Sequence, residues 1–156
     1  MQKAIGSSTV GQPSGGAGLL AIRFATRHLL RVDIDLTGFS ATQQQALFDL
    51  LVLAMYADGH LTTVEDEQLQ KLLAAMGHTE ESDRQRAFDA AVSRTRPFIQ
   101  SIRQAKEHAL LLAEAFTARA QQQQVYAAVQ QIMVSDHNVS SWEGTLLSEL
   151  RLKFRL

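Results

Sequence analysis

Residues 40–76 decide the fold, and they read SATQQQALFDLLVLAMYADGHLTTVEDEQLQKLLAAM. The first part of this stretch carries apolar side chains at the 0, 3, 4, 7 spacing of a buried helical stripe, at Leu47, Leu50, Leu51 and Ala54. The last part repeats the spacing at Leu69, Leu72, Leu73 and Met76. Ser40 and Gln43 match a capping box, and Gly77 stands where a left-handed residue ends a helix. The stretch therefore predicts a helix, a short polar loop near Asp58-Gly59 and a second helix that begins after Thr62.

The same spacing continues to the end of the chain. A third helix is predicted from Thr79, and Pro97 is placed to start the next one. Three later stripes lie at residues 109–116, 125–133 and 146–154. Each stripe needs a partner to bury it, so the sequence predicts an all-α fold. We expect a compact bundle of about six to eight helices with two pseudo-repeated helix–loop–helix halves.

The N-terminal part differs in composition from the rest. Residues 1–18 are rich in glycine and serine and predict a flexible segment. Residues 19–39 form a basic amphipathic lead-in, with Arg23, Arg27 and Arg31 four residues apart on one helical face. Residues 40–156 form the helical domain. The basic stripe of residues 19–31 is typical of a solvated face, and it also suits contact with anionic lipid or an acidic partner.

Composition excludes several classes of function. The net charge of the 156 residues is −1, which argues against nucleic acid as the partner. The chain has no cysteine, so disulfides and thiol chemistry are absent. No apolar stretch approaches the roughly 20 residues that span a bilayer, and the N-terminus lacks a secretory signal, so we expect a cytoplasmic protein. No phosphate-binding glycine loop or nucleophile elbow is present, and we expect no enzyme.

One polar unit occurs twice. Residues 57–65 read ADGHLTTVE and residues 135–143 read SDHNVSSWE. Asp, an aliphatic residue, two hydroxyl residues and Glu fall in register, 78 positions apart, and a leucine follows each copy at Leu69 and Leu147. Each copy follows one apolar helix and precedes another. The match predicts an internal duplication.

These motifs resemble TerB-like domains of tellurite-resistance proteins. The resemblance covers about residues 40–154, and the second copy departs from the pattern because His137 replaces the glycine. The resemblance implies an all-helical bundle whose acidic residues cluster where the two halves meet and bind a divalent cation. At matching positions those residues are Asp58, Glu65, Asp136 and Glu143.

The chemistry of the repeated unit allows two interpretations. Asp58, Gly59, Leu61 and Glu65 reproduce the second half of a calcium-binding EF-hand loop, and two such half-loops could together supply four carboxylates to a hard cation of the calcium type. Alternatively, Thr62-x-x-Glu65 and Ser140-x-x-Glu143 are capping boxes, in which each Glu only completes a helix N-terminus. Both interpretations stay open at this stage.

The leading functional hypothesis is a non-enzymatic TerB-like module that binds a divalent cation through the acidic loops of both halves. Its use would be a tellurite-type stress response or the recruitment of a protein partner. The alternative is a metal-free helical module that binds a protein partner, or a peripheral membrane adaptor that works through residues 19–31.

Overall fold

The computed structural model describes residues 34–56, 63–134 and 140–156, all within one compact unit that spans residues 31–156. The predicted flexible segment (residues 1–18) and residues 19–33 of the predicted lead-in lie outside the described residues. The two polar loops, residues 57–62 and 135–139, lie outside them as well. The described part contains the helices α2 (Ala41–Tyr56), α3 (Thr63–Ala75), α4 (Glu81–Thr95), α5 (Ile102–Ala113), α6 (Arg119–Met133) and α7 (Ser141–Phe154). Two short 3-10 helices complete it, η1 (Leu36–Gly38) and η2 (Arg96–Phe98).

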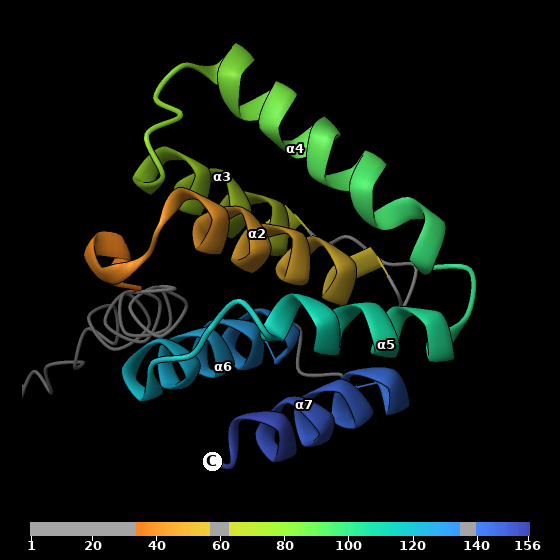
Figure 1. Ribbon diagram of the computed structural model, residues 1–156. Helices are drawn as coiled ribbons and strands as arrows, with labels where there is room; N and C mark the ends of the chain where they lie inside the picture. The colour runs from red at the N-terminus through yellow and green to blue at the C-terminus, as the bar shows by residue number, and fades with distance from the viewer. Residues whose placement is uncertain (1–33, 57–62, 135–139) are drawn as a thin grey trace, which may run out of the picture. The chain divides into compact units, whose positions relative to one another are not determined.

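The described part has no strand, which confirms the predicted all-α fold. Figure 1 shows α2 between α4 on one side and the α5, α6 and α7 group on the other. Helix α7 packs on both α5 and α6. None of the described helices is long and apolar enough to cross a membrane.

Helix α2 is the centre of the core. Every side chain from Ala46 to Met55 is buried, not only the predicted stripe. A helix that is apolar all round must be covered all round, and α2 is covered by α4, α5 and α6. The predicted stripes of α3, α6 and α7 join the same cluster, which includes Leu69, Leu72, Leu73, Val125, Val129, Ile132, Leu146 and Leu150.

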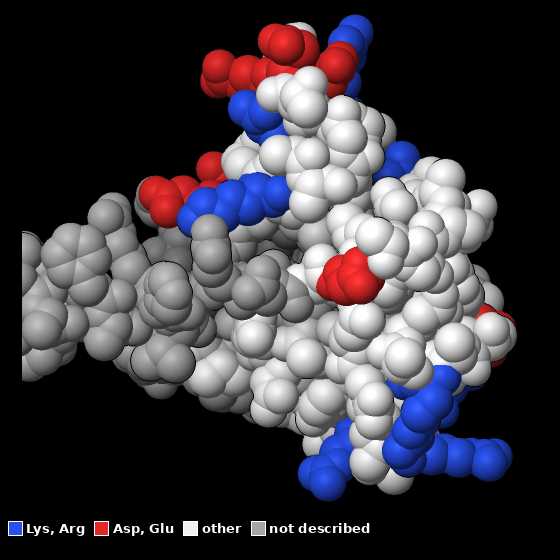
Figure 2. Space-filling view, turned by 90° about the vertical axis from the view of Figure 1, so that its left-hand side faces the viewer, with Lys and Arg blue, Asp and Glu red and all other residues white. Residues whose placement is uncertain are grey.

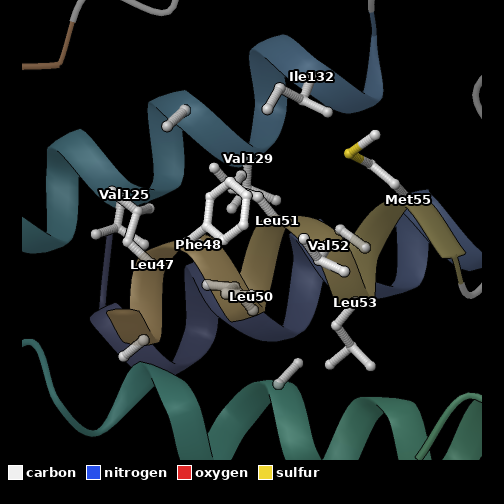
Figure 3. Packing of buried hydrophobic residues seen from close by; sticks show 14 of the residues in the cluster. Leu47, Phe48, Leu50, Leu51, Val52, Leu53, Met55, Val125, Val129 and Ile132 are labelled. Carbon is white, nitrogen blue, oxygen red and sulfur yellow. The ribbon is translucent and has the colours of Figure 1, made fainter. Parts of the chain in front are cut away.

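Helices α2 and α6 run side by side in the same direction. At their beginnings the amide of Gln43 donates to Gln121 Oε1 over 3.1 Å. Figure 3 shows Leu47 beside Val125 and, at the far ends of the two helices, Met55 beside Ile132. Their C-terminal ends therefore reach the same end of the bundle.

The helix boundaries confirm most of the local signals. Ser40 and Gln43 form the predicted capping box, with Ser40 N–H donating to Gln43 Oε1 and Gln43 N–H donating to Ser40 Oγ. Gly77 has a φ of +101°, as a left-handed C-terminal cap requires. The predicted helix start at Pro97 is wrong. Pro97 lies in η2, and α5 begins at Ile102, where the Ser101 hydroxyl accepts from Gln104 N–H and caps the helix.

A shift of 78 residues relates the bounds of four helices. It carries the start of α2 at Ala41 to the start of α6 at Arg119, and the start of α3 at Thr63 to the start of α7 at Ser141. The ends of these helices agree to within one residue. The described residues with positive φ are Gly77 and Arg155, which also lie 78 apart. The bounds of the two pairs of helices thus agree, and the internal duplication itself stays a prediction.

Candidate functional site

The four predicted acidic residues are unequally described. Asp58 and Asp136 lie outside the described residues, and Glu65 is described only as part of the backbone of α3. Glu143 alone has a described side chain, in the first turn of α7. The structure therefore places the helices to which the acids are attached, and it details one of the four carboxylates.

Glu143 is a buried carboxylate in a complete capping box. Its side chain is 3% exposed, and its Oε2 accepts the backbone N–H of Ser140 over 2.6 Å. In return the Ser140 hydroxyl accepts Glu143 N–H over 3.2 Å. The predicted capping role of Glu143 is confirmed, and the N-terminal dipole of α7 favours its negative charge.

Two buried polar side chains, one within the first two turns of α3 and one in the first turn of α7, have atoms without hydrogen-bond partners among the described residues. Gln68, in α3, is 4% exposed, and within the part of the chain that the structure describes neither its Oε1 nor its Nε2 is hydrogen-bonded. Trp142, beside Glu143 in α7, is 4% exposed and its Nε1 is unbonded. An unpaired buried polar group costs about 1–3 kcal/mol, so Gln68 needs an explanation.

The described residues do not by themselves complete a metal centre. No three His, Asp or Glu side chains within residues 34–56, 66–134 and 140–156 lie close enough together to hold an ion. The structure does show that α2 and α6, which are parallel and adjacent, end at the same end of the bundle.

Sequence reasoning missed a buried ion pair on α2. The Asp49 carboxylate is 4% exposed, although its neighbours in the sequence are apolar. Arg94 of α4 binds it through two hydrogen bonds, from Nε to Oδ2 over 2.8 Å and from Nη2 to Oδ1 over 2.7 Å. The hydrogen bond to Asp49 raises the pKa of Arg94 above its ordinary value. The pair fixes α4 against the central helix.

His108 of α5 lies in the same region. Its ring stacks on Phe98 of η2, with 3.7 Å between ring centroids and 10° between the planes. Burial lowers the pKa of His108 below the ordinary value of 6.5, and the negative charge of Asp49 acts in the opposite sense. The neutral ring is therefore favoured in the folded protein.

We expect protonation of His108 to destabilise the fold. Its folded pKa is lowered, so below about pH 6.5 the unfolded chain binds this proton more readily than the folded chain. The free energy of unfolding should consequently fall as the pH drops below that value, and His108→Gln should remove part of this fall. Urea unfolding of both proteins across mildly acidic pH measures the difference. Identical pH profiles would contradict the expectation.

A groove of about 310 Å³ lies between α2, α3 and α4. Its apolar lining includes Phe48, Leu73 and Met76, and polar atoms come from Gln44, His78 and Arg94. The volume is at the lower end for small-molecule sites. No carboxylate lines the groove, and the guanidinium of Arg94 is already bound to Asp49.

Comparison with known proteins adds no family assignment. No protein-family model matches the chain, and neither the curated proteins nor the solved structures contain a match.

Proposed function

We propose that this protein is a non-enzymatic helical module that binds a divalent cation through the acidic loops of its two halves. Glu65 and Glu143 head the second helix of each half, and Asp58 and Asp136 stand in the loops before them. Carboxylates are ligands for hard cations, so an ion of the calcium type suits this set. The tellurite-type stress response follows from the TerB-like resemblance alone.

The main observation that supports the proposal is that α2 and α6 pack side by side and run in the same direction. Met55 and Ile132 lie together near the C-terminal ends of these helices, and both acidic loops begin within a few residues of them. A half-loop cannot supply the six to eight oxygens that calcium takes. Two half-loops that leave the same end of the bundle have the composition and the starting points to share one ion.

Two described side chains, Glu143 and Gln68, have the chemistry of cation ligands. Glu143 places a carboxylate in the first turn of α7, next to the second acidic loop in the sequence. Gln68 lies three residues after Glu65 in α3, and its carbonyl oxygen lacks a hydrogen-bond donor. A neutral amide oxygen is a common ligand for calcium, and a role at the ion would account for this unpaired group.

The test is thermal unfolding of EDTA-stripped protein with added calcium, magnesium, manganese or zinc. At a free ion concentration ten times Kd, linkage predicts an added stability of about 1.4 kcal/mol, a rise of several degrees in Tm. The informative variant is Glu65→Gln/Glu143→Gln. Glutamine can still complete a capping box, but it removes the charged ligands, so this variant separates capping from ion binding.

The matched control is Glu107→Gln/Glu149→Gln, which changes the net charge equally on α5 and in the middle of α7. We expect the control to respond to the ion as the wild type does. A wild-type response lost only in Glu65→Gln/Glu143→Gln supports the site. Absence of any ion response, or a response that both double variants retain, contradicts it.

The complete capping box of Glu143 favours a second candidate, a metal-free module that binds a protein partner. In that case Glu143 acts as a helix cap, and the groove between α2, α3 and α4 is one of the described concave surfaces that a partner could enter. This candidate predicts no ion response in any variant and a loss of stability when Glu143 is replaced by alanine.

A further inference from the structure

Basic side chains gather where α7 ends. Figure 2 shows Lys and Arg at the lower end of the molecule, while the acidic side chains visible on that face lie higher, chiefly around the start of α4. The group consists of Arg119 at the start of α6 and of Arg151, Lys153 and Arg155 at the end of α7. Glu114, at the end of α5, pairs with Lys153 over 2.8 Å. We call these four cations the basic end.

Part of the basic end has a local structural role. Arg119 Nη1 donates to the carbonyls of Phe154 and Arg155 over 2.8 and 2.9 Å, and Arg151 Nε donates to Leu156 O over 3.2 Å. These bonds satisfy carbonyls that the end of α7 leaves unpaired. The question is whether the fold of this helix end requires the cations.

The first half of the chain contains a matching helix end that has no cation. Its matching helix end, residues 73–77, reads LAAMG where residues 151–155 read RLKFR. Both ends form the same closing hydrogen bond over 3.0 Å, from His78 N–H to Leu73 O and from Leu156 N–H to Arg151 O. The uncharged sequence therefore makes the same helix end, and the cations of the second half are not needed to form it.

Arg155 stands in a backbone conformation that favours glycine. Its φ is +54° and its ψ is +45°, whereas the first half has Gly77 at the matching position. A side chain in this left-handed region costs energy that glycine avoids. Arg155 holds an exposed cation at a position where glycine would fit the backbone better, so the backbone of this helix end does not require it.

An exposed leucine lies among these cations. Leu152 is 73% exposed, the most exposed large apolar side chain of the described residues, and its neighbours in the sequence, Arg151 and Lys153, are exposed as well. The matching position in the first half is Ala74. Nucleic acid would engage the cations but gives no reason for an exposed leucine among them. A bilayer surface engages both, because phosphates attract the cations and the interface accepts the apolar group.

We propose that the basic end is a contact site for membranes of anionic phospholipid, with Leu152 entering the interface and the four cations lying among the headgroups. The contact is weak and peripheral. It is independent of the cation site proposed above, because it lies at the opposite end of α7 from Glu143.

The experiment is flotation of the full chain with vesicles of phosphatidylcholine and phosphatidylglycerol, and with vesicles of phosphatidylcholine alone. EDTA is present throughout, so that divalent ions cannot bridge protein and lipid and the result does not depend on the cation site. We expect partition into the anionic vesicles that weakens as salt is added. Arg155→Gly should reduce the partition about fivefold, since each basic residue contributes about 1 kcal/mol at an anionic surface.

Arg155→Gly also relieves the left-handed strain, so we expect it to fold at least as well as the wild type, which a thermal unfolding curve checks. Lys153→Ala and Leu152→Ala should each reduce partition too. The matched control, Arg103→Ala, removes one exposed cation from α5 and should reduce partition less than the basic-end variants do. Equal losses in control and basic-end variants, partition unchanged in Leu152→Ala, or concentration-dependent self-association in place of vesicle binding would overturn the proposal.

Discussion

Arg94→Met is expected to lower the free energy of unfolding by about 3 kcal/mol, because it leaves the Asp49 carboxylate buried without its partner. Removal of one member of a buried ion pair costs about 3–5 kcal/mol in measured cases. The lower end of that range applies here, since the side chain of Arg94 is 40% exposed and water can approach the pair from its side. Urea unfolding at neutral pH measures the change.

The double variant Asp49→Leu/Arg94→Met removes both charges and should recover most of the lost stability. Leucine also matches the apolar surroundings of position 49 on α2. Arg103→Met, at an exposed position of α5, serves as the control and should stay within about 0.5 kcal/mol of the wild type. The interpretation fails if Arg94→Met behaves like this control, or if the double variant is the less stable of the two.

Only one member of this ion pair could be recognised from the sequence. A single Asp within the apolar run of residues 46–55 indicates a buried charge, which must have a partner. The partner is 45 residues away, and helix periodicity carries no information about which of the 15 Lys and Arg residues it is. Periodicity likewise predicted one buried stripe on α2, whereas contacts with three other helices bury the whole surface of residues 46–55.

Motifs whose residues lie within one or two helical turns of each other predicted the structure more reliably than the apolar stripes did. The capping boxes at Ser40 and Ser140 and the left-handed Gly77 were predicted correctly, because each depends on residues close in sequence. The prediction that an α-helix begins at Pro97 failed because proline suits the first turn of a 3-10 helix as well as that of an α-helix. Of the candidate site, the sequence predicted the role of Glu143 at its helix, and the hydrogen bonds confirm that role. Its role toward a cation stays a prediction.

The two halves differ in polarity at one buried position. Gln68 of α3 corresponds, after a shift of 78 residues, to Leu146 of α7. Leu146 is 0% exposed and lies in the core, while Gln68 is 4% exposed and has two unpaired polar atoms. The same position of a similar helix therefore accepts leucine in one half and holds an unpaired amide in the other.

Gln68→Leu is accordingly expected to raise the free energy of unfolding of the EDTA-stripped protein by about 2 kcal/mol. The change removes an unpaired buried amide, worth about 1–3 kcal/mol, and adds buried apolar surface. The reverse change at the matching position, Leu146→Gln, should lower stability by about 3 kcal/mol, because it loses a buried leucine and creates an unpaired amide. Urea unfolding of the two variants gives both values.

Gln130→Leu is the matched control for Gln68→Leu, because Gln130 is exposed on α6 and leucine there should change stability by no more than about 0.5 kcal/mol. The pair of results also bears on the cation site. If the Gln68 oxygen serves an ion, Gln68→Leu should be the more stable protein without ions and should gain less than the wild type when the ion is added. A destabilised Gln68→Leu would mean that the amide is well accommodated and would remove it from the argument for a cation.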